Sequence, residues 1–308
     1  MAESTEVSAD AARDRLRAII EDVAGADARR YGARDDAGRS MDCAKIVQDT
    51  AGHYLAVYHS VLADGRFHVA LGASGDLTTW RFVRDLGRGA SQPTIHCVPG
   101  DGYLLAWEQE PRNHIAVRYY ADRDALFAGR ATRAYDARRS LSRCAEGTPT
   151  IHAVHPATDM RDWVVEIGGH YWWNCDRDRQ MSATLTGFRT WRAEERPDLD
   201  APLLAHGLGG NVGGRDPIRF LGHDFRVVEG QFAKEDFGSW RTFLCEEGTA
   251  RAQQLEIRTD GGSTAFANPH VTALDAPDGR RALMVSLFLP KEGAAPGEGG
   301  PLLYYTTC

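Results

Sequence analysis

Short apolar runs follow one another along most of this chain, and five of them begin in the same way. Each starts with a small or polar residue and a proline (alanine in the first copy), and an apolar stretch follows. The copies are Asp42-Cys-Ala-Lys-Ile46, Ser91-Gln-Pro-Thr-Ile95, Gly147-Thr-Pro-Thr-Ile151, Arg215-Asp-Pro-Ile-Arg219 and Ala267-Asn-Pro-His-Val271. They recur about every 50 to 70 residues, a spacing typical of propeller blades. Proline suits the first residue of a strand, where no ladder donor is lost, so each copy predicts the start of a strand.

A second apolar run follows each copy after a turn marked by Gly or Asp. These runs are His53-Tyr-Leu-Ala-Val-Tyr58, Tyr103-Leu-Leu-Ala-Trp107, Trp163-Val-Val-Glu-Ile167, Phe225-Arg-Val-Val228 and Ala282-Leu-Met-Val-Ser-Leu-Phe288. A pair of strands joined by a tight turn forms a hairpin, and here the hairpin repeats five times. The pattern predicts an all-β fold, a five-bladed β-propeller, over residues 41–308.

The first 40 residues form an N-terminal extension with one amphipathic helix. From Asp10 to Ala24, apolar residues recur at helical spacing and Gly25 is a stop signal; they are Leu16, Ile19, Ile20 and Val23. The fifth blade ends at the C-terminus and lacks a fourth strand of its own. Either a strand from Ala26 to Ser40 closes the ring, or the outer position is empty. Two further expectations are a long loop over Arg196 to Asn211 and a flexible loop over the glycine-rich run from Gly207.

Composition and charge exclude several classes of binding partner. The chain has 308 residues and a net charge of −7, and both signs are interspersed without a long basic block. Nucleic acid and anionic membranes are therefore not expected as partners. No apolar run is long enough to span a bilayer, and the N-terminus lacks the pattern of a signal peptide, which predicts a cytoplasmic protein. Six cysteines are scattered without a CxxC pair, so we expect them to be free and buried.

Polar residues are concentrated at the ends of the predicted hairpins. In a propeller the first strand of each blade lines the central axis, and the antiparallel second strand returns to the end where the first began. Residues at both places should converge on one polar, acidic pocket. The first-strand starts supply Asp42, Gln92, Glu146, Thr148, Arg215, Asp216, Asn268 and His270, and the second-strand ends supply His59, Glu108, Glu166 and Glu229.

Three short motifs give the chain a family resemblance. Asp216-Pro217 precedes one inner strand, Glu146-Gly147 precedes another, and Ser74-Gly-Asp-Leu-Thr-Thr-Trp80 is similar to a turn with the pattern Ser-x-Asp-Leu-x-x-Trp. With these motifs the chain resembles the five-bladed propeller glycosidases, glycoside hydrolase family 43 and its furanosidase relatives. The resemblance covers residues 41 to 308 in architecture and only these motifs in sequence.

The resemblance implies an acidic catalytic triad. In that family an Asp before the first inner strand is the general base, an Asp before the second tunes a pKa, and a Glu before the third is the general acid. Carried over, Asp42 is the base and Glu146 the acid. The middle Asp has no counterpart, because Ser91 and Gln92 stand there, and the one Asp-Pro pair, at Asp216, belongs to the fourth blade. The triad is therefore degraded, with Asp42, Glu146 and Asp216 as the catalytic candidates.

Two carboxyl groups across a pocket are the groups that sugar hydrolysis needs, one as acid and one as base. The acid must stay protonated near neutral pH, which burial or a second carboxylate arranges. The alternative for each carboxylate is a strand-end residue bonded to backbone amides or to arginine. The surrounding groups expected to bind substrate are Gln92, Trp107, Glu108, Arg215, Glu166, Glu229 and His270.

Histidines and tryptophans offer further candidate ligands. His96 and His152 occupy equivalent places in two copies and should face the channel together with His270. The resemblance implies an axial calcium as the only cofactor, although histidine is a poor calcium ligand and no metal-binding motif is present. The alternative is histidines bridged by water. Trp107, Trp172 and Trp173 either stack on a sugar or pack within the blades, and Trp107 is the preferred stacking residue because Glu108 follows it.

The function predicted from these residues is a carbohydrate-active, glycosidase-like hydrolase with a small-molecule or carbohydrate substrate. Two alternatives use the same pocket. One is a non-hydrolytic enzyme of specialised metabolism, a cyclase or lyase, which the absence of a signal peptide favours. The other is a sugar-binding propeller without catalysis, since fold does not fix function.

Overall fold

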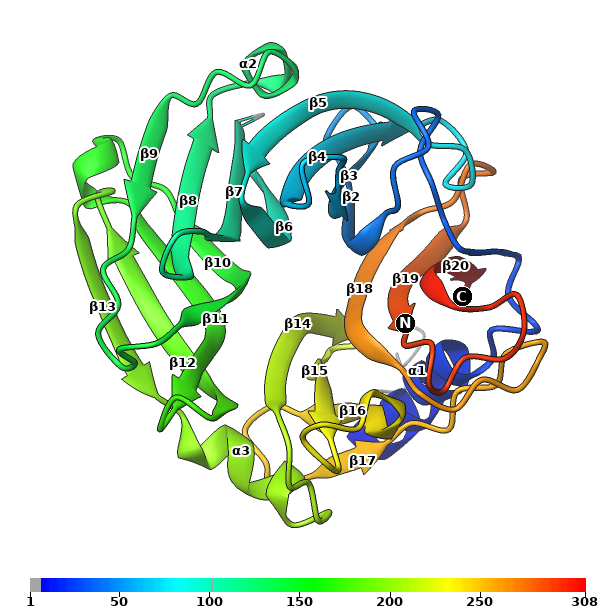
Figure 1. The fold of residues 1–308 in the computed structure, drawn as a ribbon. Helices are drawn as coiled ribbons and strands as arrows, with labels where there is room; N and C mark the ends of the chain where they lie inside the picture. Colours follow the sequence, from blue (N-terminus) through cyan, green and yellow to red (C-terminus); the bar gives the residue numbers. More distant parts are fainter. Residues whose placement is uncertain (1–6, 101) are drawn as a thin grey trace, which may run out of the picture.

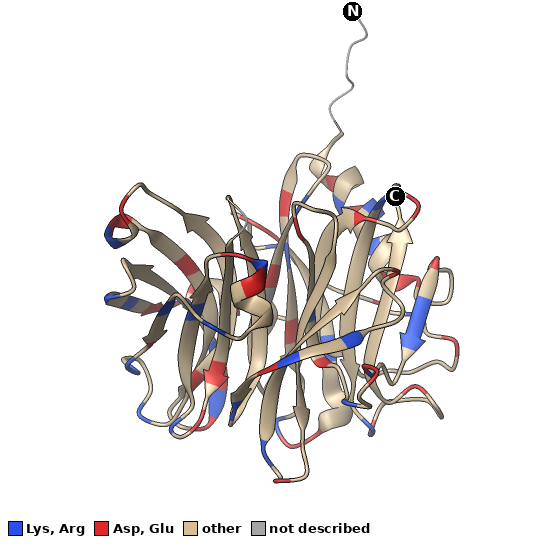
Figure 2. Ribbon diagram, turned by 90° about the horizontal axis from the view of Figure 1, so that it is seen from above, with Lys and Arg blue, Asp and Glu red and all other residues tan. Residues whose placement is uncertain are grey.

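Five antiparallel sheets of four strands each surround a central axis (Figure 1). The computed structural model describes residues 7–100 and 102–308, with side chains everywhere except at residues 214 and 215. This arrangement is the predicted five-bladed β-propeller with a short N-terminal helix. Figure 2 shows the propeller from the side, with charges of both signs spread over its blades. Among the described residues, no helix combines the length and apolar character needed to cross a membrane.

Each blade runs outward from an inner strand that lines the axis. Blade one holds β2 (Asp42–Gln48), β3 (Tyr54–Val61), β4 (Phe67–Ser74) and β5 (Arg81–Arg88). Blade two holds β6 (Ala90–Val98), β7 (Gly102–Gln109), β8 (His114–Tyr120) and β9 (Arg133–Asp136). Blade three holds β10 (Glu146–His155), β11 (Val164–Trp173), β12 (Arg177–Thr186) and β13 (Thr190–Glu195). Short helices lie in the connections, namely α2 (Arg123–Phe127), η1 (Met160–Asp162) and α3 (Pro197–Leu204).

Blade four consists of β14 (Val212–Phe220), β15 (His223–Gln231), β16 (Trp240–Glu246) and β17 (Ala252–Gln254), with η2 (Phe237–Ser239) between β15 and β16. Blade five consists of β18 (Ala267–Asp275), β19 (Arg281–Leu289) and β20 (Gly300–Thr307), and its outer strand comes from the other end of the chain. There β1 (Ala28–Tyr31) pairs antiparallel with β20. The first of the two sequence alternatives therefore holds, and the N-terminal extension closes the ring.

The N-terminal helix α1 (Ala9–Glu21) packs on the outside of blades four and five (Figure 1). Its apolar side chains, Ala12, Leu16 and Ile20, join one hydrophobic cluster with Phe225 and Leu244 of blade four and with residues of blade five. A hydrogen bond of 2.5 Å from the Tyr304 hydroxyl to the Ile20 carbonyl oxygen ties the end of the helix to β20. The extension is thus part of the fold.

A β-bulge repeats in all five inner strands and accounts for the repeated sequence motif. Pairing with the second strand is interrupted once near the start of each inner strand. In four blades the first bulge residue has a left-handed backbone: Cys43 (φ 52°), Gln92 (53°), Thr148 (50°) and Asn268 (49°). The prolines were predicted to begin the strands, but Pro93, Pro149 and Pro269 lie within the bulges. In blade four Pro217 comes directly after the bulge and pairs with Arg226. A bulge leaves a residue unpaired, so the missing proline N–H costs no ladder bond there.

The connection between blades three and four differs from the predicted long loop, because residues 197–204 form α3. Proline at the first helical position and Asp198 in the first turn both favour a helix start. The glycine run is also only partly a loop, since β14 begins at Val212. Strand pairing thus starts three residues before the Arg215 copy of the motif.

A disulfide joins Cys144 to Cys175, with 5.5 Å between their Cα atoms. The expectation that all cysteines are free and buried is therefore wrong for this pair. It also fails for Cys308, which is exposed, and for Cys97, which is half-buried. Cys43 and Cys245 are buried and form no disulfide. The bridge links the segment before β10 to the turn between β11 and β12. The two cysteines are 31 residues apart, so their spacing gave no sign of the pairing.

Removing this bridge should lower the free energy of unfolding by about 2–4 kcal/mol, because an open chain has more conformational freedom when unfolded. The test is urea denaturation of the Cys144→Ala/Cys175→Ala double variant beside the oxidised parent protein. Cys308→Ala, which removes an exposed free thiol, is the matched control and should change little. Equal stability of the double variant and the oxidised parent would contradict a structural role for the bridge.

Candidate functional site

We call the side of the propeller where the inner strands begin the bulge face. There the second strand of a blade reaches across to the inner strand of the next blade. His59 Nδ1 accepts a 3.0 Å hydrogen bond from the Gln92 backbone N–H. Glu229 Oε2 accepts one of 2.5 Å from the Asn268 backbone N–H. Polar side chains at this face therefore hold neighbouring blades together.

Two glycines make room for this arrangement in the other blades. A Cβ atom on Gly147 would lie 2.1 Å from Glu108 Oε2, and one on Gly213 would lie 1.9 Å from His170 Cε1. Glu108 of blade two thus lies against the inner strand of blade three, and His170 of blade three lies against that of blade four. Between blades five and one, the Ser286 hydroxyl donates to the Ala44 carbonyl oxygen at 2.5 Å.

Asp42 is the first residue of β2 and is half-buried at the bulge face. Its Oδ1 accepts a 2.6 Å hydrogen bond from the Ser40 hydroxyl. Burial raises the pKa of Asp42, and the Ser40 hydrogen bond and the charge of Arg34 only partly oppose this effect. A carboxyl group that holds its proton to higher pH than usual, and that is not fully buried, is suited to proton transfer.

Glu108 is the second half-buried carboxylate at this face. Its Oε1 accepts a 2.5 Å hydrogen bond from Asn113 Nδ2, in the turn between β7 and β8. Glu229, at a similar place in blade four, is only 2% exposed. Of the two glutamates, Glu108 is therefore the more accessible to a ligand.

The Glu146 carboxylate anchors the backbone of residues 140–142. Only 2% of the residue is exposed, and its Oε1 accepts hydrogen bonds from three successive backbone N–H groups, of Ser140 (2.6 Å), Leu141 (2.5 Å) and Ser142 (3.0 Å). This arrangement matches the alternative of a strand-end carboxylate bonded to amides. Its assignment as the general acid stays a prediction.

Asp216 is buried beneath the bulge face in an ionic network. Its Oδ2 lies 2.5 Å from Lys45 Nζ, 3.2 Å from His270 Nδ1 and 3.0 Å from the Val271 backbone nitrogen. Burial alone would raise the pKa of Asp216, but the Lys45 charge and the His270 contact hold it well below its usual range. An arginine was the partner that the sequence alternative offered for such a carboxylate, and Arg215 and Arg219 are the neighbouring arginines. Arg219 pairs with Asp224 instead, and the Arg215 side chain lies outside the described residues.

The Lys45 contact was missed because Lys45 was read as a strand residue. In the five copies of the motif its position otherwise holds Thr94, Thr150, Ile218 and His270, and only the first copy has a cation there. A lone lysine among inward-facing positions was the available signal for a buried carboxylate partner. His170 was missed for another reason, which is that β11 extends further than its apolar core.

The length of β11 also changes the position of Glu166. The strand runs from Val164 to Trp173, so Glu166 lies near its start and away from the bulge face, where it contacts His155 Nε2 at 2.9 Å. The predicted placement of Glu166 beside the other carboxylates is wrong. In blade three His170 lies opposite Gly147, and this is the position that Glu108 occupies opposite Ser91 in blade two.

The three tryptophans differ in exposure, and the preferred stacking residue, Trp107, is the buried one. Trp107 is 2% exposed and belongs to the hydrophobic cluster between blades one and two, which corresponds to the packing alternative. Its Nε1–H donates to Gln109 Oε1 at 2.9 Å. Trp172 and Trp173, by contrast, are 44% and 45% exposed at the end of β11 on the bulge face. These two indole rings are therefore accessible to a ligand at this face.

A cavity of about 410 Å³ lies on the axis among all five inner strands. His96 and His152 both line it, as predicted, and burial lowers the pKa of each. Asp216 is its one carboxylate beside Lys45 and Arg219, so this cavity differs from the predicted acidic pocket. The described residues contain no group of three potential metal ligands. Calcium needs six or more oxygen ligands, and this set does not fit that ion.

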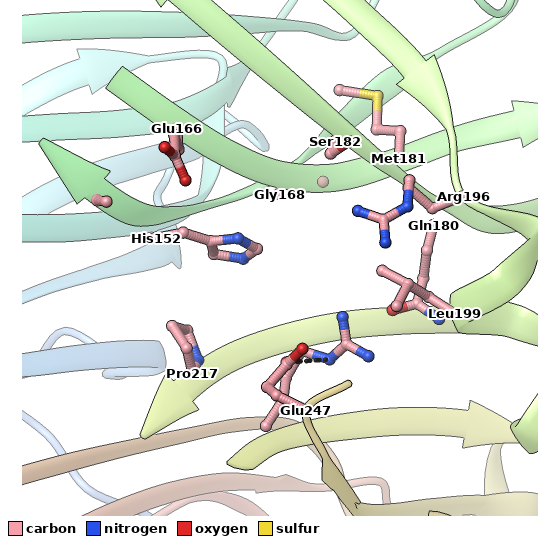
Figure 3. A pocket seen from close by; sticks show the side chains of 13 residues that line it. His152, Glu166, Gly168, Gln180, Met181, Ser182, Arg196, Leu199, Pro217 and Glu247 are labelled. Carbon is pink, nitrogen blue, oxygen red and sulfur yellow. Dashed lines mark ion pairs between the residues drawn. The ribbon is translucent and has the colours of Figure 1, made fainter. Parts of the chain in front are cut away.

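A second cavity, of about 200 Å³, lies between blades three and four (Figure 3). His152 and Pro217 line both cavities. Arg226 and Glu247 both line the smaller one, and Arg226 Nε lies 3.5 Å from Glu247 Oε1. Buried Gln180 lies beside Asp200, whose pKa burial raises to about 6. The other blade pairs meet through hydrophobic clusters, whereas this cavity has both polar and apolar side chains in its lining.

Comparison with solved structures supports the propeller fold. An α-L-arabinofuranosidase from Podospora anserina matches with a TM-score of 0.52 and 10% identity, over 90% of this chain and 94% of that chain. An endo-arabinase from Bacteroides thetaiotaomicron matches with a TM-score of 0.54 and 12% identity, over 91% and 97%. An exo-1,5-α-L-arabinanase from a bovine ruminal metagenomic library matches with 0.53 and 11%, over 89% and 95%.

The fold is shared with solved structures that are named as an arabinofuranosidase and arabinanases. No protein-family model matches the chain, and no curated protein matches its sequence. At these low identities the likeness shows the architecture alone. It confirms the resemblance in fold that the Asp-Pro, Glu-Gly and Ser-x-Asp-Leu motifs indicated.

Proposed function

We propose that the protein is a carbohydrate-active hydrolase that acts at the bulge face of the propeller. The observation that carries this proposal is the pair of half-buried carboxylates, Asp42 and Glu108, which adjacent blades present at that face. Exposed Trp172 and Trp173 on the same face offer flat apolar surfaces of the kind that bind sugar rings. The solved structures with this fold, named as arabinofuranosidases and arabinanases, support a glycan substrate.

In this proposal Asp42 is the proton donor. Its raised pKa keeps the carboxyl group protonated at higher pH than an ordinary aspartate, so that it can protonate the leaving-group oxygen. Glu108 is the second carboxylate, which activates water or attacks the anomeric carbon. Activity should therefore fall as the pH rises through the pKa of Asp42, because the deprotonated form has no proton to give.

The test is hydrolysis of aryl α-L-arabinofuranosides, aryl galactosides, arabinan and galactan by the parent protein and by Asp42→Asn and Glu108→Gln. Each substitution should reduce kcat by at least about 100-fold, the lower limit for loss of general acid–base catalysis. Asp162→Asn and Glu256→Gln are the matched controls, because both side chains are exposed and neither forms a hydrogen bond or ion pair with another described residue. Activity of Asp42→Asn and Glu108→Gln within a few-fold of the parent would overturn the proposed roles.

The anchoring of two other carboxylates favours a second candidate function, a sugar-binding propeller without catalysis. Glu146 holds backbone amides and Asp216 is neutralised by Lys45, so neither is placed like a group that exchanges protons with a ligand. Under this alternative the parent protein binds a glycan from the panel but hydrolyses none. Calorimetric binding measured beside the activity assay separates the two functions.

A further inference from the structure

A basic groove of about 710 Å³ lies beside the proposed site at the bulge face. It is formed by the turn between β7 and β8 and by the segment that joins β9 to β10. Its charged and titratable lining residues are Arg112, His114, Asp136, Arg138, Arg139 and Arg143. Four arginines in one groove are unexpected in a chain whose net charge is −7.

The positive charge of the groove is largely uncompensated. Asp136 is its one carboxylate, and it is already paired with Arg118 Nη2 at 2.8 Å. Arg139 donates to the Cys144 carbonyl oxygen, which is a neutral acceptor. Within the described part of the chain, no ion pair involves Arg112, Arg138 or Arg143. Guanidinium groups bind carboxylate, sulfate and phosphate oxygens in paired hydrogen bonds, so the groove suits an anion.

The groove is continuous with the exposed tryptophans. The Ser142 hydroxyl donates to the Trp172 carbonyl oxygen at 2.8 Å, and the Trp172 backbone N–H donates to the Ala145 carbonyl oxygen at 3.0 Å. The disulfide from Cys144 to Cys175 fixes the same two segments to each other. The arginine-bearing segment and the tryptophan pair are therefore held in a fixed relation.

The groove is also joined to the proposed catalytic carboxylate. Asn113, which follows Arg112, donates through Nδ2 to Glu108 Oε1 at 2.5 Å. Its carbonyl oxygen accepts the Glu146 backbone N–H at 2.9 Å. A glycan chain bound at Glu108 can therefore reach the arginines of the groove, on the side of blades two and three.

We propose that this groove binds an anionic substituent, a carboxylate or a sulfate, on a glycan whose neighbouring sugar ring stacks on Trp172 or Trp173. The inference rests on the proposed function and adds that the substrate is an acidic glycan. Arginine contacts select the charge, while the indole faces bind the apolar face of the sugar. Affinity should fall as salt concentration rises, because the groove is open to solvent.

The experiment is affinity electrophoresis in native gels that contain one polymer each: polygalacturonate, dextran sulfate, neutral arabinan or a single-stranded oligonucleotide. The parent protein is compared with Arg112→Ala/Arg138→Ala/Arg143→Ala and with Trp172→Ala/Trp173→Ala. The matched control is Arg130→Ala/Arg189→Ala/Arg192→Ala, which removes the same charge from exposed arginines in connections and an outer strand away from the bulge face. Thermal melting of every variant reports whether it is folded.

Retardation by polygalacturonate, by dextran sulfate or by both supports the inference and identifies the anion. The groove variant should then bind at least about tenfold more weakly, since one charged hydrogen bond contributes about this factor, and the control should match the parent. The tryptophan variant should also bind more weakly. Binding to neutral arabinan alone, or equal weakening by the control, overturns the inference and leaves the proposed hydrolase intact. Retardation only by the oligonucleotide, or by no polymer, also overturns it, and the activity assay on small aryl glycosides judges the hydrolase separately.

Discussion

Replacing Lys45 with methionine should lower the free energy of unfolding by about 3–5 kcal/mol, the range measured when one partner of a buried ion pair is removed. Asp216 is 1% exposed, and Lys45 Nζ lies 2.5 Å from its carboxylate. Without the ammonium group, a negative charge remains in the interior, and its partners among the described residues are then His270 and the Val271 backbone N–H. Urea denaturation followed by tryptophan fluorescence measures the change.

Two further variants show whether the loss comes from the pair itself. Lys45→Met/Asp216→Asn removes both charges and should recover most of the stability. Lys234→Met breaks an ion pair with Asp176 whose side chains are 34% and 45% exposed, so it should cost at most about 1 kcal/mol. A Lys45→Met protein within 1 kcal/mol of the parent would contradict the role assigned to the pair.

The pH dependence of stability gives the same pair a second test. The pKa of Asp216 is lower in the folded protein than the value of about 3.9 expected when it is unfolded. The stability from this charge is therefore fully present above that unfolded value and is lost as the pH falls through the folded pKa. The difference in stability between the parent and Asp216→Asn should accordingly shrink below about pH 4, and a constant difference down to pH 2 would contradict the charged contact.

The sequence predicted the propeller because its repeated motif marks the same backbone feature in each blade, a bulge near the start of the inner strand. Four copies of the motif place a proline or an alanine in a bulge, and a bulge recurs in every blade whatever the function. The polar bulge face followed from the same periodicity. The sequence did not decide whether a strand from the N-terminal extension closes the ring. The strand that does so, Ala28–Tyr31, has only four residues, which are too few for periodicity to distinguish a strand from a loop.

What the sequence could not specify depends on contacts between segments that are distant in the chain. The ion pair of Lys45 with Asp216 joins blade one to blade four. Cys175, the partner of Cys144, lies in the turn after β11, and the position of this turn could be predicted only if the end of β11 was known. The same error in the length of β11 misplaced Glu166. Burial of Trp107 follows from how blades one and two pack, which a single strand pattern does not reveal.

Replacing Glu146 with alanine should lower the free energy of unfolding by about 3–5 kcal/mol, because three backbone N–H groups lose one acceptor and each buried unsatisfied donor costs about 1–3 kcal/mol. The donors belong to residues 140–142, which lead into β10 beside the disulfide. Glu146→Gln keeps a carbonyl oxygen but loses the charge, so it should cost less. Urea denaturation of both variants measures the difference.

Glu146→Gln also decides between an anchor and a general acid. An anchor predicts a less stable protein whose kcat, measured well below its melting temperature, stays within a few-fold of the parent. A general acid predicts a loss of kcat of about 100-fold or more with little change in stability. Glu298→Gln is the matched control, because Glu298 likewise holds a loop, accepting from the Gly261 N–H at 2.6 Å and from the Thr259 hydroxyl at 2.6 Å. If Glu146→Gln loses activity and Glu298→Gln does not at equal stability, the catalytic role belongs to Glu146, and the proton donor proposed at Asp42 must be reassigned.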